Sequence, residues 1–191
     1  SNEDLIRKLE DHGGEAWLLG VSEWFYYINT EHWMKLEMAG KRFSKDMLKA
    51  KIKHYVQHRD EAKLYNVCKD DFCGYEEASD VREILGYSQP YLPQKGALGE
   101  MVLSTGGAIY LWKKGADGII DISPFTCMNG ITCEAIFPSV SRDHNNMPIR
   151  NFYFDGASQD LDRDIGIFIE LANSYSRKKK TQRGYPKTFQ D

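Results

Sequence analysis

The stretch that most constrains the fold of this chain spans residues 118–155. An apolar run at 118–123 is followed by a loop, a helical segment and a second apolar run at 149–155. Two short apolar runs joined by a helical segment predict a βαβ unit with parallel strands. Ligands bind outside the carboxyl ends of the strands in open parallel sheets. Cys127 and Asp155 fall at these ends and are therefore the first candidate site residues.

Apolar residues at helical spacing predict helices over most of the remaining chain. The helices are expected at about 2–12, 22–39, 44–65, 81–86, 97–114 and 161–175. A short apolar run at 16–19 predicts a third strand. The pair Gly106 and Gly107 inside the fifth of these helices predicts the close approach of another backbone, since glycine weakens a helix by ~1 kcal/mol relative to alanine.

Alternating helices and strands indicate an α/β fold. We expect a Rossmann-like three-layer arrangement, in which a short, mostly parallel sheet is flanked by helices. One domain is predicted over residues 1–176, with a helical insertion at about 41–95, and a basic, polar tail over 177–191 is expected to be solvated. Three strands make a thin sheet, so a further strand before Ser1 is expected, and the chain is interpreted as a fragment of a longer protein.

Bulk composition excludes several classes of protein. The net charge of the 191 residues is −3, which gives no basic footprint for nucleic acid. No apolar run approaches the ~20 residues that span a membrane. Four cysteines with irregular spacing indicate a reducing compartment, and therefore a cytoplasmic protein. Aromatic residues concentrate near the N-terminus, for example Trp24 and Phe25, and are interpreted as core.

Most familiar site motifs are missing from the sequence. It has no phosphate-binding G-x-x-x-x-G-K-[ST] or G-x-G-x-x-G, so no ATP site is expected in this chain. The aspartates from Asp160 onward fail the calcium-loop pattern, because Ile165 stands where that loop needs glycine. His54 and His58 lie four residues apart but lack a zinc-protease glutamate, and they are interpreted as an exposed pair.

The cysteines carry the sharpest chemical signal. Cys68 and Cys73 are separated by four residues, and Cys127 and Cys133 by five, which are not zinc-ribbon spacings. Iron–sulfur clusters accept ligands from separate loops, so Cys68 and Cys73 could converge on Cys127. Cys127 precedes a predicted helix, where a thiolate is stabilised, whereas Cys133 falls inside that helix and is interpreted as a small core residue.

Several short signatures resemble one family. They are Gly99-Glu100 opening a helix, the run from Gly115 to Ile120, Pro124-Phe125-x-Cys127-Met128, and Tyr153-Phe154-Asp155-Gly156. Over about residues 1–176 they resemble the C-terminal region of large proteins related to the activators of (R)-2-hydroxyacyl-CoA dehydratases, the acyl-CoA dehydratase activases.

The resemblance implies a parent system found in anaerobic bacteria. In it, an N-terminal actin/Hsp70-like ATPase with its own [4Fe–4S] cluster drives electron transfer to a dehydratase. The C-terminal region resembles dehydratase subunits, which hold a cluster on three cysteines. Cys127 falls on the family's cysteine position and Asp155 on its strand-end aspartate, with Glu100 as a neighbour; Cys68 and Cys73 match no pattern of the family.

Three hypotheses follow. The chain is an electron-transfer module with a [4Fe–4S] or thiolate site at Cys127, Cys68 and Cys73, in which Asp155 and Glu100 are binding candidates. Alternatively, it is a non-catalytic scaffold with a degenerate site, which docks the N-terminal ATPase region to a dehydratase-type partner. A third hypothesis places a small-molecule or acyl-CoA pocket at the strand ends.

Overall fold

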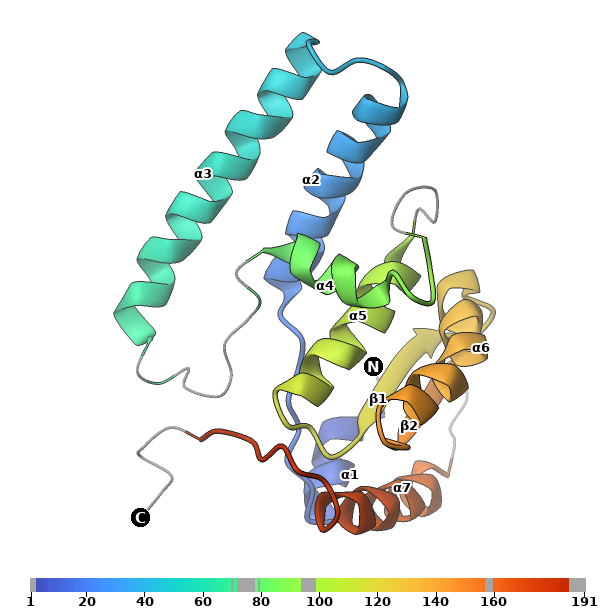
Figure 1. The fold of residues 1–191 in the computed structure, drawn as a ribbon. Coiled ribbons are helices and arrows are strands. Elements are labelled where there is room, and N and C mark those ends of the chain that lie inside the picture. Colours follow the sequence, from blue (N-terminus) through green and yellow to red (C-terminus); the bar gives the residue numbers. More distant parts are fainter. Residues whose placement is uncertain are drawn as a thin grey trace.

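The computed structural model describes residues 3–69, 71, 78, 80–93, 99–156 and 160–185, which form seven helices and two strands. Figure 1 shows their arrangement. In chain order they are α1 (Leu5–Asp11), α2 (Val21–Met38), α3 (Lys45–Cys68), α4 (Val81–Ser88), α5 (Glu100–Lys113), β1 (Ile119–Pro124), α6 (Met128–Asp143), β2 (Ile149–Phe154) and α7 (Leu161–Ser176).

The predicted βαβ unit is confirmed. β1 and β2 pair in parallel, with Ile119 opposite Ile149 and Pro124 opposite Phe154, and α6 connects them. Gly130 lets α6 lie close to β1, because a Cβ at this position would come within 2.3 Å of the Ser123 Oγ. The close contact sets the start of α6 directly over the carboxyl end of β1.

Helices cover both faces of the two-stranded sheet. On one face, Ile119 packs in a cluster with residues of α5 and α6 such as Ala108 and Phe137. On the other face, Phe152 packs with Leu5 of α1 and with two residues of α7. The chain is therefore a helix-rich α/β protein with a short parallel sheet, which is the coarser part of the predicted fold.

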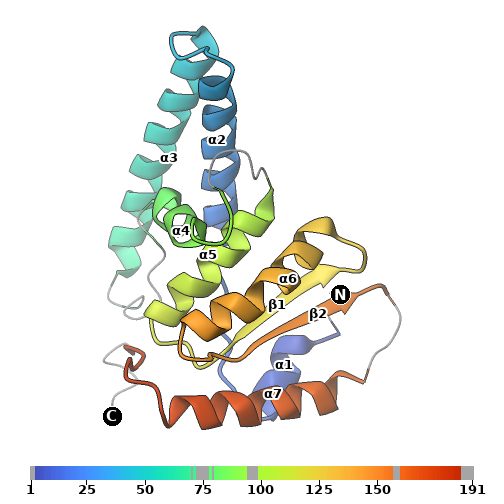
Figure 2. The same cartoon turned by 45° about the vertical axis from the view of Figure 1, so that its right-hand side comes forward.

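A hairpin of α2 and α3, which we call the arm, projects from this sheet and its helices (Figures 1 and 2). Ser44 caps the start of α3, which begins where the helix at 44–65 was predicted to start, because its Oγ accepts a hydrogen bond from the Met47 amide at 3.1 Å. α2 begins at Val21 after Gly20, one residue before the start expected at Ser22. The predicted starts of the first and fifth helices, Asn2 and Ala97, lie outside the described residues.

The predicted strand at 16–19 is wrong. This extended segment pairs with neither strand, and the described part of the chain holds two strands, not three. Its apolar side chains pack singly on different layers: Ala16 lies against the α1/α7 cluster and Trp17 against the α5/α6 cluster, while Leu18 is 68% exposed. An apolar run of this length does not distinguish a paired strand from a segment that bridges two layers.

The exposure of individual side chains corrects the predictions for the early aromatic residues and for the tail. Tyr27 is core as interpreted, but Phe25, on the same helix, is 54% exposed. The tail is exposed at most of its described residues, as expected, but two of its side chains are largely buried. The Lys179 Nζ lies 2.6 Å from the Asp117 carboxylate, and the Lys179 and Arg183 side chains are only 6% and 9% exposed. Within the described residues, no helix is long and apolar enough to cross a membrane.

Candidate functional site

Cys127 and Asp155 follow the two strands at the same edge of the sheet, as the sequence predicts. Cys127 lies three residues after β1 as the N-cap of α6, and its amide donates to the Pro124 carbonyl at 3.1 Å. Its side chain is half-buried. Asp155 comes directly after β2 and is exposed. Both side chains are therefore carried by the carboxyl ends of parallel strands, where the crevice of such a sheet opens.

Glu100 belongs to the same end of the molecule through the start of α5. A Cβ at Gly99 would lie 2.8 Å from the Asn129 Oδ1, so the starts of α5 and α6 are adjacent. The hydroxyl of Tyr27 donates to the Gly99 carbonyl at 2.8 Å and accepts from its amide at 2.9 Å. The Trp24 Nε1 donates to the Glu100 Oε1 at 2.6 Å. Glu100 is thus held by α2 at the root of the arm.

Two of the three proposed cluster ligands, Cys68 and Cys127, lie on distant elements. Cys68 is the last residue of α3 and exposed, so it belongs to a helix and not to the loop that was expected. In both Figures 1 and 2 the end of α3 lies across the molecule from the start of α6. Cys73 lies outside the described residues. The described residues contain no group of three or more His, Cys, Asp or Glu side chains placed to hold a metal ion.

The sheet carries a half-buried polar pair, Asp121 and Asn151, that was not predicted from the sequence. Asp121 in β1 lies opposite Asn151 in β2, whose Nδ2 donates to the Asp121 carboxylate at 2.8 Å. Burial, partly offset by this hydrogen bond, raises the pKa of Asp121 to about 6. A carboxylate inside the run Ile-Ile-Asp-Ile was the available signal, because a charged residue on the covered face of a strand needs a partner.

Cys133 lies near this carboxylate and is 1% exposed, which confirms its interpretation as a small core residue. Burial, and secondly the charge of Asp121, raise the pKa of Cys133 to about 12. Its Sγ lies 3.9 Å from the Thr105 hydroxyl and 3.7 Å from the Met101 carbonyl. The thiol therefore stays protonated at neutral pH and is no thiolate ligand.

A cavity of about 1160 Å³ opens beside β1. Residues 116–122 form one wall and the extended segment 14–19 lies on another. Cys127, Asp155 and Glu100 are not among its lining residues. The pocket expected at the strand ends stays a prediction.

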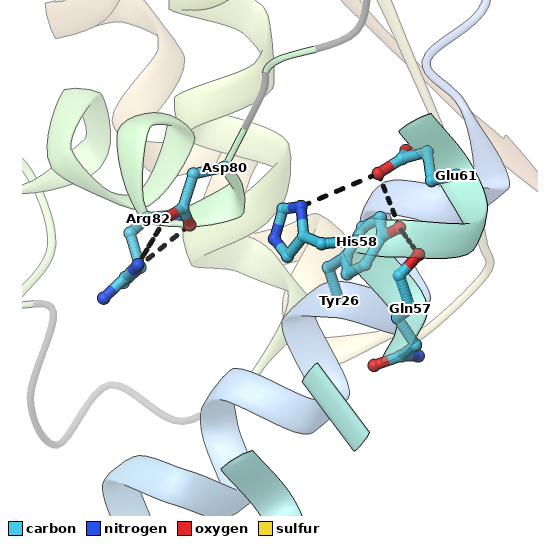
Figure 3. A network of polar contacts seen from close by, with 6 residues as sticks. All are labelled: Tyr26, Gln57, His58, Glu61, Asp80 and Arg82. Carbon is cyan, nitrogen blue, oxygen red and sulfur yellow. Dashed lines mark hydrogen bonds and ion pairs between the residues drawn. The ribbon is translucent and has the colours of Figure 1, made fainter. Parts of the chain in front are cut away.

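A network of polar and aromatic side chains braces the arm at its base (Figure 3). The Tyr26 hydroxyl donates to the Glu61 carboxylate at 2.5 Å, and the Tyr26 ring stacks on His58 with centroids 4.9 Å apart. The His54 and His58 rings lie 4.5 Å apart edge to face. Burial, and secondly the neighbouring His58, lower the pKa of His54. The two histidines are half-buried parts of a helix interface, which corrects their interpretation as an exposed pair.

The comparisons with known proteins add no relative. No protein-family model, no curated protein and no solved structure matches the chain.

Proposed function

We propose that this chain is a non-catalytic interaction module that docks onto a partner protein through the arm. The carrying observation is a stripe of apolar side chains on the outer face of α3. Leu48, Ile52 and Tyr55 are 60%, 55% and 69% exposed. Residues four and three apart lie on one face of a helix, so these three side chains form one continuous surface.

The opposite face of α3 is buried in the arm, where Met47 and Ala50 are 2% and 4% exposed. α3 thus presents two apolar faces, and only one of them is covered within the described residues. A stripe of this kind is the usual signature of a helix that lies in a groove of a partner.

Charge indicates what kind of partner fits the stripe. α3 carries six basic residues and three acidic ones, within a chain whose net charge is −3. The basic residues are Lys45, Lys49, Lys51, Lys53, Arg59 and Lys63. A partner with an apolar groove and an acidic rim would complement this surface, because matched potentials favour encounter and register.

The network at the base of the arm supports this role. The contacts of Tyr26 with Glu61 and His58 tie α2 to α3 before any partner arrives (Figure 3). A surface that is already ordered loses less conformational entropy on binding. The arm is therefore suited to present its stripe as a rigid unit.

The family resemblance suggests the setting of this function. We propose that the chain is the C-terminal module of a 2-hydroxyacyl-CoA dehydratase activase-like protein in the cytoplasm of an anaerobic bacterium. The arm would dock onto a dehydratase-type partner, and the N-terminal ATPase region of the same protein would be the second contact. A Rossmann-like three-layer arrangement around the sheet belongs to the same proposal.

Binding to a purified (R)-2-hydroxyacyl-CoA dehydratase tests the docking role. Ile52→Glu places a negative charge in the stripe and is expected to weaken binding at least tenfold, measured by calorimetry. Ile167→Glu on α7 is the matched control, because Ile167 is 52% exposed and lies on a helix outside the arm; it should bind like the unmodified chain.

Equal binding by the two variants, or no binding by the unmodified chain, contradicts the proposal. Binding of the chain to anionic lipid vesicles, lost in Ile52→Glu, without binding to the dehydratase would assign the stripe to a membrane surface instead.

The electron-transfer hypothesis stays a prediction with a separate test. The chain is purified after anaerobic expression, and its iron and acid-labile sulfide are measured beside a Cys127→Ser variant. Iron and sulfide lost in the variant would support a [4Fe–4S] cluster at Cys127. Their absence from the unmodified chain, with all four thiols free, would remove the hypothesis.

A further inference from the structure

Among the residues that the structure describes, no strand lies beside one edge of β1. In a parallel ladder, alternate residues turn their N–H and C=O groups toward the same neighbour. The amides of Ile119 and Phe125 donate to the carbonyls of Pro148 and Phe154, so the odd-numbered residues of β1 face β2. The backbone groups of Ile120 and Ile122 therefore point to the other edge, and no backbone hydrogen bond to them is found among the described residues.

The helical layers extend past this edge on both faces. The cavity of about 1160 Å³ beside β1 is lined on one face by Ala108, Leu111 and Phe137 and on the other by Leu5, Leu9 and Ile169. Unpaired N–H and C=O groups in an edge strand are a template for another strand. Here that template lies between two apolar layers, which is the environment of a central strand in a parallel sheet.

The far wall of the cavity is held away from β1 by its own contacts. The Arg183 guanidinium lies 4.4 Å from the Trp17 ring centroid and 3.0 Å from the Glu15 carboxylate. Leu19 lies against Gly107 of α5, where a Cβ would come within 2.5 Å of it. Because these contacts fix the segment 14–19 at both layers, the space between it and β1 stays open.

We propose that this cavity receives a β-strand from a partner polypeptide, which adds to the Ile120 and Ile122 edge of β1. β1 has six residues, a length of about 20 Å, so the added strand would have about five or six. Both of its faces would be covered, and its sequence would be a continuous apolar run rich in Val and Ile.

The charges around the cavity predict which residues lie on either side of the apolar run in the added strand. The acidic lining residues are Asp4, Glu10, Glu15, Asp117 and Asp121, and the basic ones are Arg7 and Arg183. This acidic excess favours lysine or arginine on either side of the apolar run. The site is separate from the stripe on α3, so strand addition is independent of the proposed docking function.

A peptide selection tests the proposal. A displayed library of ten-residue peptides, with six β-branched or aromatic positions flanked by lysine pairs, is selected on the complete chain. Selected peptides are then measured by calorimetry and by amide NMR. We expect shifts at the Ile120 and Ile122 amides and slowed exchange of both protons, as in other cases of strand addition.

A proline variant identifies the edge itself. Ile122→Pro removes an N–H that does not face β2, and proline is accepted at such edge positions. Ile122→Ala is the matched control, because it shortens the same 43% exposed side chain and keeps the N–H. Loss of one hydrogen bond is expected to weaken peptide binding about tenfold in the proline variant relative to the alanine variant. Ile52→Glu should bind peptide normally.

Three outcomes overturn the proposal. Either no peptide is selected, or selected peptides bind the two Ile122 variants equally, or the amides of Ile120 and Ile122 are already protected from exchange in the chain alone. Concentration-dependent dimerisation abolished by Ile122→Pro would replace the partner polypeptide by a second copy of this chain. Far-UV circular dichroism of both variants establishes that they are folded.

Discussion

Gly106 and Gly107 provide a sharp test of the packing, because adjacent glycines of one buried helix turn out to meet different neighbours. A Cβ at Gly106 would lie 2.1 Å from the backbone carbonyl oxygen of Ile84 in α4. A Cβ at Gly107 would lie 2.5 Å from the Cδ1 of Leu19, the end of a flexible side chain. Gly106→Ala should therefore be strongly destabilising and Gly107→Ala close to neutral.

The size of the stability loss expected for Gly106→Ala follows from the shift that α4 has to make. In Gly106→Ala, α4 must shift by about 0.9 Å to bring the 2.1 Å contact to 3.0 Å, below which real Cβ contacts are essentially not seen. Ile84 and Leu85 of α4 are 0% and 2% exposed, so the shift loosens a close-packed contact. Overpacking of this kind costs about 3 kcal/mol at its upper range. The gain from replacing a helical glycine offsets about 1 kcal/mol, which leaves a net loss of about 2 kcal/mol.

The same helical gain applies to Gly107→Ala, where Leu19 can rotate away, and its stability should stay within about 1 kcal/mol of the unmodified chain. Urea unfolding followed by circular dichroism compares the two free energies. A loss of about 2 kcal/mol also predicts a melting temperature lower by about 4–8 °C for a chain of this size. Equal stabilities of the two variants would refute the placement of α4 against α5 at Gly106.

Two further predictions concern polar groups. The folded pKa of Asp121, about 6, lies above its ordinary value of 3.8, so its contribution to stability is present at low pH and is lost as the pH rises from 4 to 6. Asp121→Asn should therefore be more stable than the unmodified chain above pH 6, by up to about 3 kcal/mol, and equally stable near pH 4. Urea unfolding of both proteins between pH 4 and pH 7 measures this difference. A difference that is the same at every pH contradicts the prediction. Tyr27→Phe removes the hydroxyl that bonds both the amide and the carbonyl of Gly99 and should cost about 1–3 kcal/mol in the same assay, whereas unchanged stability would show that water replaces the hydroxyl.

The site was predictable in part. The strand-end positions of Cys127 and Asp155 were placed correctly, because a βαβ unit puts both strand ends at one edge. The joining of Glu100 to that edge depends on contacts across the chain, from Tyr27 to Gly99 and from Gly99 to Asn129. Asp121 was visible in the sequence only as a carboxylate within an apolar strand; its partner Asn151 became apparent with the register of β2.

Side-chain exposure was mispredicted at residues whose packing partners lie far away in the sequence. The histidine pair on α3 looked like a solvated face, yet Tyr26 of α2 stacks on His58. Most of the basic tail is exposed as predicted, yet Lys179 and Arg183 pair with Asp117 and Glu15. Such outcomes depend on residues far away in the chain, which periodicity and composition do not report.

The sequence by itself determined the βαβ unit, the seven helical segments and the close approach at Gly106, because periodicity, caps and glycine chemistry act within a few residues. Only the tertiary structure decided that the segment 14–19 stands apart from β1 and that the arm leaves its Leu48, Ile52 and Tyr55 stripe uncovered. It also decided that the end of α3 lies across the molecule from the start of α6. These facts rest on contacts between distant parts of the chain. Both proposed binding surfaces, the stripe on α3 and the free edge of β1, arise from that long-range packing.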